Sequence, residues 1–240
     1  MKDGIEVAER GNTAWMKLGQ TEIGRVLESN GPFASVYDFF PDATPENLAL
    51  HRHWPEPRAL EPHTDKLVTP IQSYVIRTLQ APGACRTEGI VLSRTEVAAC
   101  EKLHRARSDP SYVENVLLAI EAGQAVLVDD DHPSDDYLRS EPTPGHIHGH
   151  CARHIDGRGA EALVTGNLIH SPIQCRYPHR NFRHGANNPP AALTRRNFFE
   201  RFSDCLTKVL TAHFLLPSAG HLKAEGNGFR FAYRDKDRFM

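Results

Sequence analysis

Three short segments in the second half of the chain place a histidine or an amide where a site could form. They are Thr143–His150, which reads Thr-Pro-Gly-His-Ile-His-Gly-His, then Thr165–Asn167 and Ala212–Phe214. Pro-Gly before His146 breaks a strand, so a loop there can present the imidazole toward a cleft. Asn167 and His213 each follow an apolar run at a predicted strand end, where polar site residues gather in α/β folds. The three segments predict a convergent polar site, although strand ends are also often polar because they are solvated.

Histidine is concentrated in the same region. Of the 14 histidines, nine lie between His146 and His221. Imidazole is a common zinc ligand, but a lone histidine is more often structural or exposed. If a strand follows His150, then His150, Ala152 and His154 share one of its faces, which is either a site wall or a wet outer face. Local compositional bias therefore stays as the alternative interpretation.

Composition limits the classes of partner. The 240 residues, 40% hydrophobic and 24% charged, are ordinary for a soluble globular protein and can form one large or two small domains. A net charge of −2 gives no reason to expect nucleic acid or an anionic membrane as a partner. No apolar run approaches the roughly 20 residues of a membrane span, and the N-terminus does not read as a secretory signal. Five cysteines without paired spacing (Cys85, Cys100, Cys151, Cys175, Cys205) favour reduced thiols and a cytoplasmic protein.

In the first half, alternating polarity over 13–18 and 21–28 around Gly19-Gln20 predicts a hairpin. The proline-rich stretch 31–70 predicts irregular surface structure, with a short helix opened by Thr44-Pro45. The β-branched run 71–77 predicts a strand in a buried sheet position.

Further on, 89–92 predicts a strand, and Ser93–Glu96 has the spacing of a capping box for a helix reaching Arg107. Ser111–Glu114 repeats that spacing before a second helix, which Gly123 ends. We expect more strands at 125–128, 160–168, 206–212 and 228–231, and a helix beginning at Asn188-Pro189. The acidic residues of 129–136 lack the pattern of a calcium loop and predict a solvated turn. The alternation of strands and helices favours a layered α/β fold.

With these segments in view, the chain resembles the metallo-β-lactamase superfamily, in the branch of lactonase-like and organophosphate-hydrolase-like enzymes. The first matching block, from about Trp15 to Thr78, includes Gly31–Phe33, Phe40–Pro45 and Gln72–Arg77. The second, from about Gly89 to Phe231, includes Glu121–Gln124, Pro142–His146, Thr165–His170, Thr194–Arg196 and Ala212–Phe214. The resemblance implies a single domain over residues 1–240 that forms a four-layer αββα sandwich, and zinc-dependent hydrolysis of small lactones or esters.

The resemblance also implies site roles at three positions. His146 matches a ligand of the first zinc and His213 matches a ligand of the second. Asn167 stands where the family has an aspartate that bridges both metals. His170 lies where relatives often carry a histidine, and it receives no role.

The family's His-x-His-x-Asp-His ligand motif is absent from this chain. It belongs between the strand near Thr78 and the strand near Gly89, where only 79–88 joins the two blocks. We therefore expect a deletion that truncates the first sheet. A catalytic zinc needs about three protein ligands, and the neutral amide of Asn167 is a poorer ligand than a carboxylate. His148, His150, His154, His170 and Cys151 are candidate substitute ligands, although their spacing does not require it.

Three interpretations follow. The chain is a metallo-β-lactamase-fold protein with an incomplete metal site and weak or no hydrolysis of a lactone or ester. Alternatively it is a non-catalytic binding or scaffold protein, or an incomplete splice or gene-model product of an active hydrolase. An oligomer that covers the truncated sheet is left open.

Overall fold

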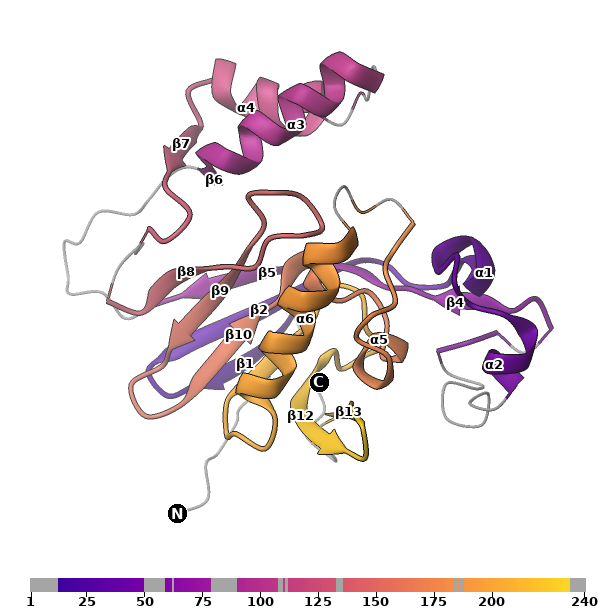
Figure 1. Cartoon of the computed structure of the whole chain (residues 1–240). Helices are drawn as coiled ribbons and strands as arrows, with labels where there is room; N and C mark the ends of the chain where they lie inside the picture. The colour runs from indigo at the N-terminus through magenta and orange to yellow at the C-terminus, as the bar shows by residue number, and fades with distance from the viewer. Residues whose placement is uncertain are drawn as a thin grey trace.

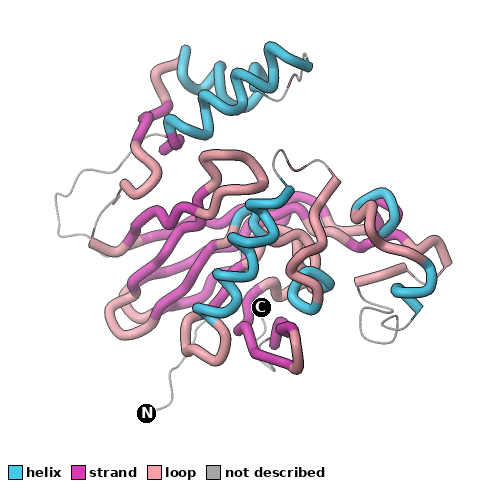
Figure 2. Tube along the Cα trace, viewed as in Figure 1, coloured by secondary structure: helices cyan, strands magenta, loops and turns pink. Residues whose placement is uncertain are grey.

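The computed structural model describes residues 13–49, 59–61, 63–78, 90–107, 110, 112–132, 136–183, 185 and 188–233. The proposed deletion point at 79–88, Cys85 and the predicted cap Ser111 lie outside the described residues. Within the described residues the chain is a mixed α/β structure with two main sheets (Figures 1 and 2).

The first sheet has the order β1-β2-β5. Strands β1 (Thr13–Leu18) and β2 (Thr21–Ser29) form the predicted antiparallel hairpin, with Leu18 opposite Thr21. Strand β5 (Ile71–Arg77) pairs with β2 in antiparallel orientation and has the predicted bounds.

The expectation that β5 occupies a buried sheet position is wrong. Ile71 is 38% exposed and Val75 is 43% exposed, while Gln72 on the opposite face is buried. Among the described strands β5 is the last of its sheet, so only alternate side chains face the second sheet.

The second sheet has the order β13-β12-β11-β10-β9-β8 and is antiparallel except for the pair β10–β11. Its strands are β8 (Leu138–Pro142), β9 (Cys151–Asp156), β10 (Glu161–Val164), β11 (Lys208–Leu210), β12 (Ala219–Glu225) and β13 (Gly228–Tyr233).

Two strands of this sheet are shorter than predicted. The strand expected over 160–168 ends at Val164, and the 3-10 helix η2 (Gly166–Leu168) follows. The chain turns there because Gly166 adopts φ +50°. The strand expected over 206–212 spans Lys208–Leu210, and Leu206 is 95% exposed. Both strands end early, which places Asn167 and His213 in turns beyond the sheet.

The two sheets pack face to face, and helix α6 (Asn188–Phe202) covers the outer face of the second sheet (Figure 1). The inter-sheet core contains Met16, Leu18, Ile23, Ile155, Ala162, Leu210 and Ala219. The core under α6 contains Phe198, Phe199 and Phe202 against Leu163, Val209, Leu222, Phe229 and Phe231. These clusters make the layered α/β arrangement that the alternating pattern predicts.

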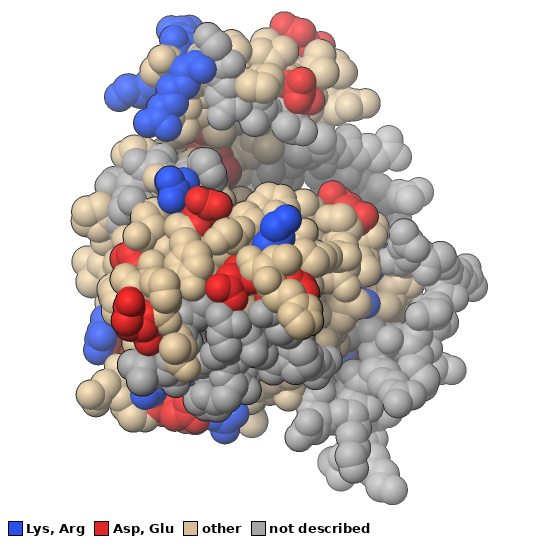
Figure 3. Space-filling view, turned by 90° about the vertical axis from the view of Figure 1, so that its right-hand side faces the viewer, with Lys and Arg blue, Asp and Glu red and all other residues tan. Residues whose placement is uncertain are grey.

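A small unit stands apart from these layers in Figure 1. It consists of β6 (Ile90–Ser93), α3 (Arg94–Arg107), the π-helix η1 (Val113–Leu117), α4 (Leu118–Glu121) and β7 (Ala125–Val128), with β6 and β7 parallel. The predicted cap is present, since the backbone N–H of Glu96 donates to Oγ of Ser93 at 3.0 Å. In Figure 3 both basic and acidic side chains lie on this unit, whose α3 ends with Arg105 and Arg107, and both signs of charge also occur over the rest of the described face.

The stretch 31–70 is more ordered than predicted. It contains β3 (Pro32–Ser35), α1 (Val36–Phe39), α2 (Pro45–Ala49, opened as predicted) and β4 (Lys66–Val68), with β3 and β4 paired. A buried apolar cluster forms here from Phe39, Phe40 and Leu60 together with Ile173 of α5 (Ile173–Arg176). Burial of these side chains explains why the stretch forms regular structure despite its prolines. In the described part of the chain no helix is both long enough and apolar enough to cross a bilayer.

Candidate functional site

The three segments that the sequence singles out meet at one end of the second sheet. Nε2 of His213 lies 2.7 Å from Oδ1 of Asn167. The ring centre of His170 lies 5.2 Å from that of His213 and 5.0 Å from that of His146. His146 also lies 6.2 Å from His150, measured between ring centres. We call His146, His150, His170 and His213 the histidine cluster.

His146 is placed by the glycine that precedes it. Gly145 has φ +142°, and a Cβ at this position would lie 2.3 Å from Cα of Ala191 in α6. Only glycine allows both the backbone conformation and the close approach to the helix. The Pro-Gly pair therefore sets the loop against α6 and directs the following imidazole into the cluster.

His150 is fixed by two neighbours. The backbone N–H of Asn167 donates to its Nε2 at 2.9 Å. Its Nδ1 lies 2.8 Å from Oγ1 and 3.2 Å from the carbonyl oxygen of Thr143. Since Nε2 accepts, the proton of the neutral ring is on Nδ1, from which it can donate to Thr143. Both nitrogens of His150 are therefore already hydrogen-bonded within the protein.

His213 is likewise engaged at both nitrogens. Nδ1 lies 3.2 Å from the carbonyl oxygen of Pro70, and Nε2 contacts Asn167. The ring stacks on His170 with an interplanar angle of 4°. His170 in turn stacks on Phe182, with ring centres 4.4 Å apart. Among the described residues, no hydrogen-bond partner reaches the buried Nδ1 atoms of His146 and His170.

Burial keeps the histidine cluster uncharged. It is the largest cause of the lowered pKa of His146 and of His150, each to about 4. Burial also lowers the pKa of His213, and it takes that of His170 well below its ordinary value of 6.5, with His146 and His213 adding to the effect. The cluster therefore presents neutral imidazoles near pH 7.

Arg195 of α6 holds the backbone next to the cluster in place through hydrogen bonds. The sequence alone does not predict this role. Arg195 is 3% exposed, and its guanidinium donates to the carbonyl oxygens of Leu168, Pro178 and Arg180 at 3.0, 2.5 and 2.8 Å. Gln174 adds a further hydrogen bond, because its Oε1 accepts from the backbone N–H of His170 at 2.7 Å. The Thr194–Arg196 motif of the sequence is the signal that points to Arg195.

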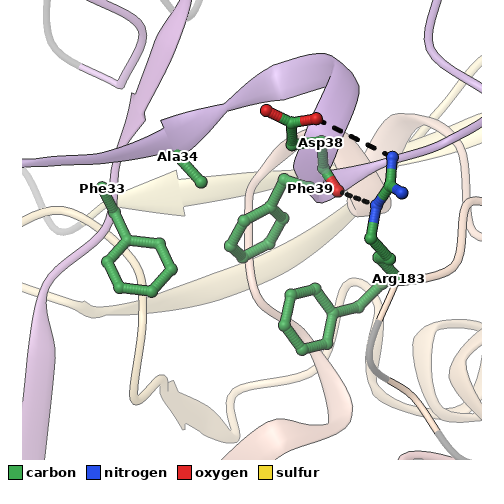
Figure 4. Close-up of a pocket in the computed structure, with 6 residues that line it drawn as sticks. Phe33, Ala34, Asp38, Phe39 and Arg183 are labelled. Atoms are coloured by element: carbon green, nitrogen blue, oxygen red, sulfur yellow. Dashed lines mark hydrogen bonds and ion pairs between the residues drawn. The ribbon is translucent and has the colours of Figure 1, made fainter.

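An aromatic pocket of about 240 Å³ borders the cluster (Figure 4). It is lined by Phe33, Ala34, Asp38, Phe39, Phe182 and Arg183. Phe182 and Phe39 are shared with the cluster, since both rings also contact His170. Nε of Arg183 donates to the backbone carbonyl oxygen of Asp38 at 2.6 Å. The guanidinium of Arg183 also lies 3.9 Å from the side-chain carboxylate of Asp38. The pocket is therefore a mainly apolar space closed on one side by an ion pair.

The remaining candidate ligands lie outside the cluster. His148 is exposed. Nδ1 of His154 accepts from Nε of Arg139 at 2.8 Å, and His154 and Ala152 lie on a buried face of β9, which excludes a wet outer face. Sγ of Cys151 donates to the carbonyl oxygen of Asp130 at 3.4 Å.

The residues present do not fit a zinc centre. A metal needs free lone pairs that converge from about three ligands, but Nε2 of His150 accepts from Asn167 and both nitrogens of His213 already have partners. In the described ranges no three His, Cys, Asp or Glu side chains are grouped so that they could hold an ion. The arrangement matches a hydrogen-bonded network better than a ligand set.

Comparison with known proteins identifies the fold. The structure matches a hydrolase of the β-lactamase superfamily, AbOPH, with a TM-score of 0.75 at 14% identity over 96% of this chain and 100% of that one. It matches AidC, a dizinc quorum-quenching lactonase solved with the product N-hexanoyl-L-homoserine, with a TM-score of 0.76 at 15% identity over 95% and 100%. A probable metal-dependent hydrolase from Staphylococcus aureus matches with a TM-score of 0.60 at 11% identity over 92% and 99%. No family model and no curated protein matches the sequence.

The class defined by these matches is an α/β protein with the metallo-β-lactamase fold. The structure thus confirms the fold expected from the sequence resemblance. The same solved structures include zinc-dependent and metal-dependent hydrolases, so the likeness in fold is to that group of enzymes.

Proposed function

We propose that the chain is a single metallo-β-lactamase-fold domain that binds a small ester- or lactone-like molecule and hydrolyses it weakly or not at all. The observation that carries this proposal is that imidazole nitrogens of the histidine cluster are already hydrogen-bonded within the protein. His213 and His150 use their nitrogens on Asn167, Pro70 and Thr143, and are therefore not free to act as ligands. The incomplete ligand set in the sequence supports the same conclusion.

The aromatic pocket supports a binding role. Its phenyl rings give an apolar surface for the alkyl or aryl part of a ligand, and Phe39 and Phe182 connect it to the neutral imidazoles of the cluster. A ligand with an apolar tail and a polar neutral head fits both features. Lactones with an acyl chain have this chemistry, and the lactonase AidC was solved with the ring-opened product of one, N-hexanoyl-L-homoserine.

A binding experiment tests this proposal. We expect N-hexanoyl-L-homoserine lactone to bind the purified protein in titration calorimetry. Phe33 lines the pocket and is 57% exposed, so the F33A variant removes apolar contact without opening a core. It should weaken binding by about fivefold, or ~1 kcal/mol. The matched control is L206A, which removes a 95% exposed side chain that does not line the pocket and should bind as the wild type does.

Two outcomes would overturn the proposal. Equal binding by F33A and the wild type would show that the aromatic pocket is not the binding site. Lactone turnover that rises with added zinc and disappears with chelator would make the chain a zinc hydrolase instead.

The alternative of an incomplete gene product is favoured by one observation. The family's motifs are found on both sides of 79–88, as an in-frame loss of the segment between them would leave them. Asn167 in place of the family's aspartate argues the other way, because an incomplete gene product would keep that aspartate. Sequencing the transcript across the codons for Thr78 to Gly89 decides between them, since an intact ligand block there would favour an ordinary hydrolase.

A further inference from the structure

The contacts of Asn167 contain a conflict that its side-chain orientation must resolve. Nδ1 of His213 faces the carbonyl oxygen of Pro70 at 3.2 Å, and a carbonyl can only accept, so Nδ1 must carry a proton. Nε2 of the same ring faces Oδ1 of Asn167 at 2.7 Å, and an amide oxygen also only accepts. Both contacts are favourable together only for a doubly protonated, charged imidazole.

A charged ring does not suit this position. His213 is stacked against the buried ring of His170, and among the described residues it forms no ion pair with a carboxylate. A buried cation without a counter-ion is costly, so the neutral ring is favoured. A neutral ring has one N–H, and the contact with Pro70 uses it.

The amide group can resolve the conflict because its oxygen and nitrogen have nearly the same size and shape. A half-turn of the side chain exchanges the two atoms without moving any neighbour. We propose that Asn167 presents its amide nitrogen to His213 and donates to Nε2, so that Asn167 locks two histidines at once. Its backbone N–H holds His150 and its side-chain N–H holds His213.

This assignment gives Asn167 a role that an aspartate could not fill. A carboxylate has no N–H to donate and can only accept from Nε2, and as a counter-ion it would favour the doubly protonated, charged ring, because Nδ1 also donates to Pro70. Asparagine therefore positions His150 and His213 through hydrogen bonds that require no metal. The departure from the family's aspartate is, on this inference, a change of structure and not only the loss of a ligand.

The test is to locate the imidazole protons by long-range ¹H–¹⁵N NMR on the full chain near pH 7. In the wild type we expect both His150 and His213 to carry the proton on Nδ1, with or without EDTA, and to keep their signals on addition of one equivalent of zinc. In the N167D variant we expect His213 to carry a proton on both ring nitrogens, because the carboxylate and the carbonyl oxygen of Pro70 both accept. The N227D variant makes the same change of charge at an exposed turn residue and should leave the His213 spectrum as in the wild type.

Two results would overturn the inference. A proton on Nε2 of His213 in the wild type would show that the amide oxygen faces the ring. Loss or shift of the His150 and His213 signals with stoichiometric zinc would show that these rings are ligands. The inference goes beyond the proposed function: failure of lactone binding leaves the tautomer result intact, and a wrong tautomer leaves lactone binding intact. If N167D does not fold, the wild-type spectra alone decide.

Discussion

At the scale of single residues, the buried guanidinium of Arg195 is the strongest support of the site. Replacement by methionine keeps much of the volume but leaves the carbonyl oxygens of Leu168 and Pro178 without their donor, while that of Arg180 keeps only the side-chain N–H of Gln174. Because buried unpaired polar groups are costly, we expect R195M to lower the free energy of unfolding by about 3 kcal/mol in urea denaturation.

The neighbouring residue provides the control for this prediction. Arg196 is exposed and pairs with Glu200 one turn along the same helix, at 2.8 Å. R196M should cost only about 0.5 kcal/mol, the usual value of such a pair. Equal losses in the two variants would mean that Arg195 does not hold the site together.

The neutral histidines predict a dependence of stability on pH. In the unfolded chain His146 and His150 titrate near 6.5, and in the folded protein their pKa is about 4. Between these values the unfolded chain binds more protons, so the free energy of unfolding should fall as the pH drops from about 6.5 toward 4. Above this window the histidines contribute no slope.

The measurement is urea unfolding in EDTA at several pH values for the wild type and for H146F, whose new ring replaces one that already stacks on Phe182. The acid-induced loss should be smaller in H146F, and the comparison cancels the contribution of other groups. Identical pH slopes for the two proteins would count against the burial of a neutral His146.

The residue scale also shows what the sequence could reveal of the site. His146, Asn167 and His213 were recognised from glycine spacing and strand ends, and the structure brings them together. The partnership of Asn167 with His150 was not foreseen, because a backbone N–H leaves no trace in the sequence. Phe182 was missed too, since a lone aromatic residue in a polar loop has no periodic pattern.

At the scale of elements, the approach of α6 to the His146 loop depends on one glycine. G145A places a methyl group 2.3 Å from the backbone of Ala191 and forces alanine into positive φ. We expect a loss of about 2 kcal/mol or more in unfolding free energy. G159A is the control, because its φ is +112° but no atom lies within 4 Å of the new Cβ. A loss in G145A no greater than in G159A would show that the contact with α6 is unimportant.

The β6–β7 unit should be less stable than the centre of the second sheet. The pair has two strands among the described residues, and α3 has no fully buried side chain, whereas β9 and β10 each have a strand on both sides. Amide hydrogen exchange should therefore be faster in β6 and β7 than in β9 and β10. Equal protection would mean that the unit opens only with the whole fold.

Most elements were predictable because their signals are local. The hairpin around Gly19, the capped α3 and the run of β5 follow from alternation, capping spacing and β-branched residues. The early ends of β10 and β11 were not predictable, since a turn at Gly166 competes with an apolar run that would also suit a strand. The exposed face of β5 depends on which strands lie beside it, and its own sequence does not contain that information.

At the scale of the whole molecule, the fold is kept while the ligand motif is absent. The match to AbOPH and AidC covers nearly the whole chain, although the sequence lacks the His-x-His-x-Asp-His block. Two packed cores lie within the described residues, one between the sheets and one under α6. Burial of these apolar side chains stabilises the architecture.

The most direct test of the central claim is the zinc content of the protein purified without chelator. Mass spectrometry of the metal, set against the protein concentration, should give well under one zinc per chain, because His150 and His213 are committed to hydrogen bonds with the protein. A content near two zinc ions per chain would contradict the account and would assign the chain to the active hydrolases that share its fold.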